Sequence, residues 1–464
     1  MADPFLLAHI VHPLFFDIGG RLSPISIRDQ MIRGRLVVDR AWEERLIGPS
    51  RDLLVIGAGA AGGTAAIRAA QRGVRTTLID AAPAPFLRQA LCCSRWVDPT
   101  QYDWPLDHWA QGIYHWRPPA MPLPWPANRA NVLAAGWTGL LNRARRRYLP
   151  PLLNVLYNTT VAGIPTLASP PLSLHVVLNV RGTHGVPMNF GMVVSCVGFG
   201  TEQCTLGTYT GFAFWDNDPF ELLPHLGLSE PPRILISGGG DGALQDFLRI
   251  VTTCASAQAI YSRLRLPTYV ESELQSAEDD ANRAYIWGEK RLHDHDIHHR
   301  LHQTHQRLVD SLLPLGAQSS VPELLSGLAA ILRDPLPEVE LVFPCDHFSQ
   351  CYGLNRFLVL LIATFLQRQH TSRRIPLRPY TKVVAVTGTH PHMCHNNPSS
   401  CHGQPHQVTL EDGHRCVGST PTPVSSGVDY HVVVIRHGIV PPTPVFGTTR
   451  TAPPRQLLPY HVSS

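Results

Sequence analysis

Uninterrupted apolar runs mark the strands that this chain is expected to bury in a sheet. Residues 53–56 are all apolar, and residues 74–79 form a second strand-like run. Strands whose apolar residues do not alternate with polar ones are typical of a parallel sheet that is covered on both faces. Between the two runs lie a glycine turn and an alanine-rich segment at 64–71, which favours a helix that ends at Gly73. The order predicts a strand–helix–strand unit.

The first glycine turn has the spacing G-x-G-x-x-G. Its first glycine allows a sharp bend, its second lets backbone approach a pyrophosphate, and its third lets helix pack on strand. Asp80 follows the second strand, 23 positions after Gly57, and its carboxylate could bind both ribose hydroxyls and would repel a 2′-phosphate. This favours FAD or NAD over NADP at a site made of Gly57, Gly59, Ala60, Ala61, Gly62 and Asp80. A glycine turn that binds no nucleotide remains the alternative.

A second strand–turn–helix pattern lies at 233–248. The apolar residues 234–236 lead into a run of glycines and then into a helical segment. The run at 257–261 is predicted to be the next strand, and arginines follow it where the first unit has an acid. An arginine at the end of that strand would accommodate a 2′-phosphate, which indicates NADP(H). The residues assigned to this second site are Gly238, Gly239, Gly240, Asp241, Gly242 and Arg263.

Four motifs carry a family resemblance. The run GGGDGALQD from Gly238 resembles the pyridine-nucleotide turn of thioredoxin reductases, whose consensus is close to GGGDSALEE. The segment 261–263 is similar to their His-Arg-Arg segment, although only Arg263 is kept. VVSCVGFG at 193–200 and VVVIRHGIVP at 432–441 resemble the strands that close the two nucleotide folds of that family. The chain thus resembles the flavoproteins with two dinucleotide-binding domains, which include thioredoxin reductases, glutathione reductases and flavin monooxygenases. The resemblance implies FAD in the first fold and NAD(P)H in the second.

The chain departs from that family in three ways. No C-x-x-C or C-x-x-x-x-C pair lies where its disulfide reductases carry theirs, so that activity is not expected. Residues 267–370 are longer and more helical than a simple nicotinamide domain, so we interpret them as a helical insertion. The family's terminal Gly-Asp segment, which contacts the flavin, has no counterpart in the 23 residues after Pro441. FAD binding is therefore either incomplete or made by different residues.

The predicted architecture is α/β, with two Rossmann-type domains that each have three layers and a parallel sheet. We divide the chain into an N-terminal extension at 1–50, an FAD-type domain at 51–200, and an NAD(P)-type domain at 201–266 and 371–464, interrupted by the insertion. The extension is expected to be a helical or irregular cap whose polar face exposes Arg28, Arg33, Arg35 and Arg40 to solvent.

Two clusters of histidines raise the question of a metal. His295, His298, His299, His302 and His305 lie on one predicted helix, in a polar setting for which a solvated helix is the simpler interpretation. His390, His392, Cys394, His395, Cys401, His402 and His406, with Cys416 beyond, match no C-x-x-C zinc module, so a surface loop between strands at 382–386 and 407–410 is favoured over zinc. No metal site is assigned.

The catalytic residues cannot be named from the sequence. The loop at 81–126 is rich in aromatic residues and prolines, and it could cover a substrate or pack on its own domain. His108 in that loop is the one candidate acid or base, and a structural role is favoured for it. The adjacent Cys92 and Cys93 are not expected to form a redox pair, because neighbouring cysteines bond only in strained geometry.

Composition narrows the class of protein. The chain has 464 residues, of which 44% are hydrophobic and 16% charged, as in an ordered globular protein. Its formal charge of +4 implies no nucleic-acid partner. Ten scattered cysteines and the lack of a basic signal region favour a cytoplasmic location. The longest apolar run, 357–366, is about half the length of a membrane span, so a buried helix is favoured there. The number of subunits is left open.

These patterns predict an FAD-dependent oxidoreductase that uses NAD(P)H. Without redox cysteines, it would oxidise or oxygenate a small organic substrate and would not reduce disulfides. The alternative is a nucleotide-binding sensor or scaffold protein with Rossmann folds and little catalytic activity, which the absent terminal flavin segment favours.

Overall fold

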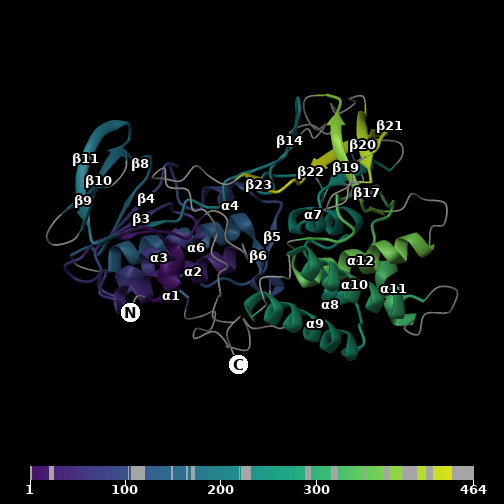
Figure 1. Ribbon diagram of the computed structural model, residues 1–464, viewed down its shortest axis with the longest axis horizontal. Coiled ribbons are helices and arrows are strands. Elements are labelled where there is room, and N and C mark those ends of the chain that lie inside the picture. The colour runs from purple at the N-terminus through teal and green to yellow at the C-terminus, as the bar shows by residue number, and fades with distance from the viewer. Residues whose placement is uncertain are drawn as a thin grey trace. The chain divides into compact units, whose positions relative to one another are not determined.

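The computed structural model divides the chain into two compact units (Figure 1). Unit 1 holds residues 1–93, 108–201 and the chain from 439, and unit 2 holds residues 94–107 and 202–438. The structure describes residues 3–19, 26–102, 104–105, 121–147, 150–163, 166–168, 173–218, 220, 231–287, 294–314, 322–349, 351–369, 376–388, 405–413 and 422–440.

The centre of unit 1 is a six-stranded sheet in the order β1-β2-β12-β3-β4-β7. Every neighbouring pair is parallel except β1 and β2. β3, β4 and β12 are buried along their whole length, which explains why their sequences do not alternate. The strands are β1 (Ile10–His12), β2 (Phe15–Asp17), β3 (Leu53–Ile56), β4 (Thr76–Ile79), β7 (Leu153–Leu156) and β12 (Met192–Ser195).

Unit 1 has three layers. Helices α3 (Ala60–Gln71) and α6 (Ala130–Arg147) contact the sheet, and α2 (Ile27–Glu43) packs against α3 (Figure 1). The other face is covered by an antiparallel sheet of β8 (Thr159–Val161), β10 (Ser173–Val180) and β11 (Thr183–Phe190), to which β9 (Thr166–Ala168) is added. Leu174, Val176 and Leu178 of β10 form one core with Leu54 and Val193 of the central sheet.

Unit 2 repeats this plan. Its sheet has the order β18-β17-β16-β22 and is parallel throughout, and its strands are β16 (Arg233–Ser237), β17 (Glu338–Val342), β18 (Leu377–Arg378) and β22 (Val432–Ile435). Helices α7 (Asp241–Val251), α8 (Ala257–Arg263) and α12 (Gly353–Gln369) share a core with one face of the sheet. An antiparallel sheet of β19 (Thr381–Val386), β20 (His406–Asp412) and β21 (Thr422–Tyr430) shares a second core with the other face. The predicted class, α/β with two Rossmann-type three-layer domains, is confirmed.

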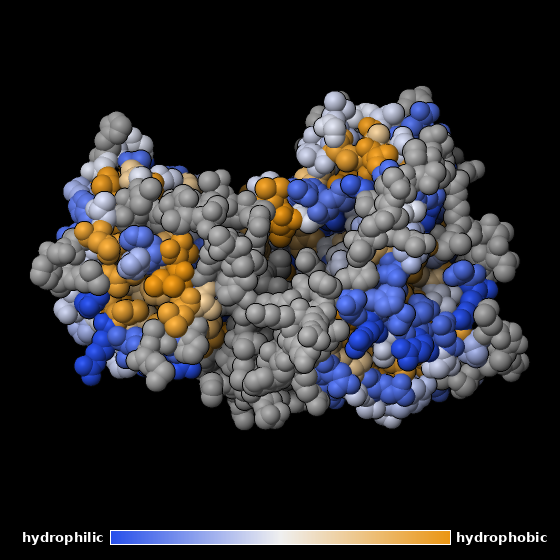
Figure 2. All heavy atoms as spheres, viewed as in Figure 1, coloured by the Kyte–Doolittle hydropathy of each residue, from blue (hydrophilic) through white to orange (hydrophobic). Residues whose placement is uncertain are grey.

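Further helices of unit 2 lie between α7 and β17. They are α9 (Thr268–Trp287), α10 (Asp294–Leu312) and α11 (Pro322–Ile331), and polar residues predominate on the surface over this helical part in Figure 2. The remaining short elements are α1 (Pro4–His9), α4 (Leu87–Leu91), η1 (Pro99–Tyr102), β5 (Trp96–Val97), β6 (Asn128–Arg129), β13 (Thr201–Glu202), β14 (Thr205–Leu206), β15 (Tyr209–Thr210) and β23 (Ile439–Val440).

The strand predicted at 257–261 is wrong, because these residues begin helix α8. The Ser256 side chain accepts a hydrogen bond from the N–H of Ala259 and so caps the helix, and the two buried residues, Ala257 and Ile260, are three apart, as on one helical face. The strand that pairs with β16, as we expected of residues 257–261, is β17. It lies within the segment 267–370, which we had interpreted as an insertion. The domain bounds from the sequence otherwise stay a prediction.

The exposure predicted for the N-terminal arginines is wrong for three of them. Arg28, Arg33 and Arg35 of α2 are buried, whereas the side chain of Arg40 is partly exposed. The extension is also part of the fold and not a cap, since β1 and β2 join the central sheet. The acid that compensates Arg35 is Asp39, whose carboxylate also binds Arg68 of the adjoining helix α3 and Arg72, which caps the end of that helix.

Two smaller predictions are confirmed. The apolar run at 357–366 lies in the buried helix α12, and β19 and β20 pair as the predicted antiparallel hairpin. Among the described residues, no helix is both long and apolar enough to cross a membrane.

Candidate functional site

The first glycine turn lies at the carboxyl end of β3, and two of its positions require glycine. Gly57 has φ +102°, and a Cβ there would lie 2.5 Å from the carbonyl oxygen of Cys196. A Cβ on Gly62 would lie 1.7 Å from the carbonyl oxygen of Gly57. Because both obstructing atoms belong to the backbone, no side-chain movement could make room. These two glycines serve the fold itself.

Gly59 differs from both neighbours in the motif. It caps the N-terminus of α3 with φ −79°, and a Cβ there would meet nothing within 4 Å. The fold therefore does not need glycine at position 59. A ligand bound close to the backbone would need it, because a side chain would occupy the ligand's place. Ala60 and Ala61 form the first turn of α3, where N–H groups have no partner within the helix and the helix dipole favours an anion. The turn fits the pyrophosphate of a dinucleotide.

Asp80 lies directly after β4, beside the glycine turn. Its two carboxylate oxygens accept hydrogen bonds from the backbone N–H groups of Ala58 (2.5 Å) and Ala82 (2.7 Å). A carboxylate has about four acceptor positions, so it can also accept bonds from a ribose. A hollow of about 320 Å³ opens beside the next residue along the chain, and its lining includes Ala81, Asn158 and Arg181 but not Asp80. The geometry suits the predicted contact with ribose hydroxyls.

The second glycine turn repeats the backbone geometry of the first. Gly238 has φ +145°, and a Cβ there would lie 2.3 Å from the carbonyl oxygen of Arg436. Gly240 caps α7 with extended backbone, as Gly59 caps α3, and a Cβ there would meet only the carbonyl oxygen of Ser349, at 3.7 Å. Gly239 and Gly242 would place a Cβ 3.2 Å from Phe343 and 3.4 Å from Phe214, respectively.

Three backbone hydrogen bonds around the first glycine turn have counterparts around the second, so the residues of the two turns can be aligned. The N–H of Gly57 donates to Ile79 and that of Gly238 to Val342, at 2.8 and 2.9 Å. The second bond comes from the residue after the strand on the other side of β3 or β16. The N–H of Cys196 donates to the carbonyl of Ile56, and that of Arg436 donates to the carbonyl of Ser237. The third bond closes the loop after the next strand, from Phe86 to Ala58 and from Ser349 to Gly239. By this alignment Phe343, and not Arg263, occupies the position of Asp80.

Arg263 is the last residue of helix α8 and is exposed. It therefore does not follow a strand, and the predicted contact with a 2′-phosphate has no structural support. The residue that the structure brings to the second turn is Arg436, which belongs to the predicted strand motif at 432–441. Its side chain runs along the first turn of α7, with Cδ 3.5 Å from where a Cβ of Gly242 would lie, and its Nε binds Asp246.

Asp241, the first residue of α7, is held by three donors. Its Oδ1 accepts hydrogen bonds from the Asn355 side chain (2.6 Å) and the N–H of Tyr352 (3.2 Å), and its Oδ2 accepts one from Gln245 (2.8 Å). Burial of this carboxyl group raises its pKa to about 6, which the hydrogen bonds only partly offset. A group that gains and loses charge near pH 6 therefore lies at the N-terminus of helix α7.

The pKa of Asp241 predicts a pH-dependent stability. The folded state binds this proton more tightly than the unfolded state, so the stabilisation is complete below about pH 4 and is lost as pH rises through 6. We expect Asp241→Asn, which cannot ionise, to gain about 2–3 kcal/mol relative to the parent between pH 4 and 7. Urea unfolding of both proteins across that range measures this difference. Parallel stability curves would contradict the assignment.

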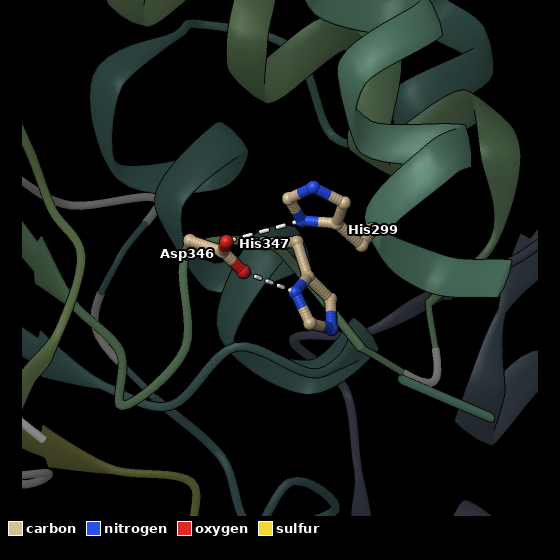
Figure 3. A group of neighbouring side chains, drawn as sticks. All are labelled: His299, Asp346 and His347. Atoms are coloured by element: carbon tan, nitrogen blue, oxygen red, sulfur yellow. Dashed lines mark hydrogen bonds and ion pairs between the residues drawn. The ribbon is translucent and has the colours of Figure 1, made fainter. Parts of the chain in front are cut away.

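The histidines predicted on one helix lie on α10 but do not converge on one another. His305 is buried and contacts Glu278 (3.5 Å), and the Nδ1 of His302 accepts a hydrogen bond from the N–H of Phe348. His298 hydrogen-bonds to Arg356. His299 instead meets two residues that the sequence did not single out, Asp346 and His347, which follow β17 (Figure 3). The side chain of His295 lies outside the described residues.

Several other predicted residues lie outside the described part of the chain: His108, His390, His392, Cys394, His395, Cys401, His402 and Cys416. His406 is described, and its Nδ1 lies 2.7 Å from the carbonyl oxygen of Thr387 in the hairpin. In the aromatic loop, Trp125 packs on Trp137 and Trp104 packs on Phe357, so these two rings belong to hydrophobic cores. Cys92 and Cys93 are not bonded to each other.

Comparison with known proteins supports the predicted cofactor of the first glycine turn. Residues 52–91 match the family described as FAD binding domain, a stretch that contains the whole turn and Asp80. The match confirms the predicted resemblance to FAD-binding flavoproteins there. Among curated proteins, no match is found.

Several solved structures are similar to the chain, at low sequence identity. The thioredoxin reductase of T. acidophilum is 13% identical over 85% of this chain and 79% of its own, with a TM-score of 0.35. The cadaverine monooxygenase of desferrioxamine biosynthesis from Erwinia amylovora, bound to FAD, is 11% identical over 84% and 79%, with a TM-score of 0.40. The protein OTEMO, in complex with FAD and NADP, is 10% identical over 87% and 74%, with a TM-score of 0.37.

Proposed function

We propose that the chain is an FAD-dependent oxidoreductase that NAD(P)H reduces and that oxidises or oxygenates a small organic substrate. The observation that carries the proposal is the repeated turn, in which Gly59 and Gly240 each cap a helix and each leave room for a close ligand. The family match at 52–91 supports FAD at the first turn. Nicotinamide is assigned to the second by the repeated geometry and the sequence resemblance.

The residues of the two turns would bind and orient the cofactors. Backbone N–H groups at the start of α3 and α7 would hold the diphosphates, and Asp80 would hold a ribose. When bound, the cofactors supply hydride transfer from nicotinamide to flavin. The chain's own contribution is to fix these binding sites on rigid parallel sheets. A catalytic acid or base is not assigned.

Four of the described cysteines are unsuited to disulfide exchange, which supports a different reaction. Burial raises the pKa of the thiols of Cys196, Cys204 and Cys254, and raises that of Cys351 to about 12. Disulfide exchange needs a thiolate, which such groups do not form near neutral pH.

The test of the proposal is the identity of the bound cofactor and its reduction. The purified full-length chain should show flavin absorption and release FAD on denaturation. Addition of NADH or NADPH without oxygen should bleach that absorption. A colourless protein that does not take up added FAD would instead support the sensor or scaffold alternative.

Gly240→Val is expected to impair the proposed nicotinamide site while leaving the FAD site intact. The fold can accept a side chain here, because only Ser349 lies near the new Cβ and the backbone is extended. The variant should keep its FAD but lose at least tenfold in the rate of flavin reduction by NAD(P)H, since the valine would occupy the place of the diphosphate. Anaerobic stopped-flow absorption measures the rate, and dithionite, which needs no nicotinamide site, is the control reductant. Unchanged reduction by NAD(P)H would place the nicotinamide elsewhere.

A further inference from the structure

Three potential metal ligands meet beside the second glycine turn (Figure 3). His299 comes from α10, and Asp346 and His347 come from the loop after β17. The Nδ1 of His299 lies 3.1 Å from one carboxylate oxygen of Asp346, and the Nδ1 of His347 lies 2.6 Å from the other. One ligand atom from each residue can be chosen so that all three lie within 4.8 Å of one another.

We propose that His299, Asp346 and His347 bind a divalent transition-metal ion. Two imidazole nitrogens and one carboxylate are the donors of mononuclear zinc and iron(II) sites, whereas Mg²⁺ and Ca²⁺ prefer oxygen ligands alone. Around one tetrahedral ion such donors lie about 3.4 Å apart, so the ligand atoms, which lie within 4.8 Å of one another, need to approach by at most about 1.4 Å. The proposal is independent of the cofactors proposed above.

The surroundings keep two of the three ligands in place. Phe348, the residue after His347, packs between the rings of Phe343 and His302, and its N–H donates to His302. The loop is further tied to the glycine turn by the bond from Ser349 to Gly239. These contacts fix Asp346 and His347 before an ion arrives, which lowers the cost of forming the site.

The exposure of the ligands suits an ion that enters from solvent. The His347 side chain is 1% exposed, whereas those of His299 and Asp346 are 33% and 27% exposed. An ion would therefore have protein on one side and water on the other, with room for water or a small ligand to complete its coordination. Three protein ligands with an open position are typical of metal sites that act on a bound molecule.

The test is the stoichiometry of Zn²⁺ binding by calorimetry, with Co²⁺ absorption as an independent probe. The full-length protein should carry Cys394→Ser and Cys401→Ser, because the His/Cys segment at 390–406 is a separate candidate for zinc. After treatment with a chelator, we expect one Zn²⁺ per chain. The same preparation should give a Co²⁺ spectrum with nitrogen and oxygen ligands.

Variants decide whether the three residues are the ligands. His299→Gln and Asp346→Asn remove one donor each from partly exposed positions, and each should weaken Zn²⁺ binding at least tenfold. His298→Gln, one position earlier on the same helix, is the matched control and should bind as the parent does. Circular dichroism verifies that each variant is folded. No stoichiometric binding, equal binding in all variants, or equal loss in the control would overturn the proposal.

Discussion

Gly59→Val should give a folded protein that no longer retains FAD. Because a Cβ at this position meets no atom within 4 Å and the backbone is extended, the new side chain should alter the stability of the cofactor-free protein by less than about 1 kcal/mol. The branched side chain would, however, fill the space in which the pyrophosphate approaches the helix. We expect flavin content to fall from near one per chain to below a tenth, as measured by absorption after purification.

Gly62→Ala is the contrasting variant. Its Cβ would lie 1.7 Å from the carbonyl oxygen of Gly57, so helix α3 would have to move away from the sheet. We expect this variant to lose stability, and with it flavin, whereas Gly59→Val loses flavin alone. Thermal unfolding of both proteins, each stripped of cofactor and compared with the stripped parent, distinguishes the two effects. Full retention of FAD by Gly59→Val would refute the assignment of the first site.

The sequence was most informative where its signals are local. The first unit could be predicted because an apolar strand, a glycine turn, a helix and Asp80 follow one another without interruption, and each has a distinct pattern. The second turn was predicted for the same reason. What local patterns could not show was which strand comes next in the sheet, because this depends on the path of the chain between them.

β17 was missed because it looks polar and lies far along the chain. Its sequence alternates, with Glu338 and Glu340 between apolar residues, and the described residues between α7 and β17 include four helices. Glu340 is tolerated there because the Tyr430 hydroxyl donates to it and Arg378 lies 3.4 Å from it. The apolar run at 257–261 was mistaken for the strand, although the capping residue Ser256 was a helix signal.

The cluster of Figure 3 illustrates the same limit. His299 was recognised as one of several helical histidines, but Asp346 and His347 lie 47 and 48 positions further on. They become neighbours only because α10 packs beside α12 and the carboxyl end of β17 points to the same region. Pairs on one helix were the only combinations that sequence spacing could propose. The burial of the α2 arginines was missed for a related reason: the acids that bind Arg28 and Arg35 lie on the same helix, but the packing of α2 against α3 is not visible in the local sequence.

Unit 2 contains a buried network of ion pairs beside helix α7. Asp246 binds Arg95 and, at 2.9 Å, Arg436, and Asp218 binds Arg249 through two bonds of 2.9 Å. All five side chains are almost fully buried. Burial acts to raise the pKa of Asp218, but Arg95 and Arg249 outweigh it and lower the value to about 2. The Asp218 carboxylate is therefore ionised throughout the physiological range.

Asp246→Ala should be among the most destabilising substitutions in the chain. It would leave Arg95 and Arg436 buried without their shared carboxylate, and removing one partner of a buried ion pair typically costs about 3–5 kcal/mol. We expect a loss of this size in the urea unfolding of unit 2. Glu323→Ala is the control, because its ion pair with Arg265 has side chains that are 65% and 80% exposed and should contribute less than about 1 kcal/mol.

The same variant should also impair the second site, since Asp246 fixes Arg436 and Arg436 lies against the first turn of α7. Asp246→Asn keeps the shape of the side chain but removes its charge, so it should destabilise unit 2 by an intermediate amount. Flavin content should be unchanged in both variants as long as unit 1 stays folded. If Asp246→Ala unfolds at the same urea concentration as Glu323→Ala, the buried network does not stabilise unit 2, and its role must be sought in the position of Arg436 alone.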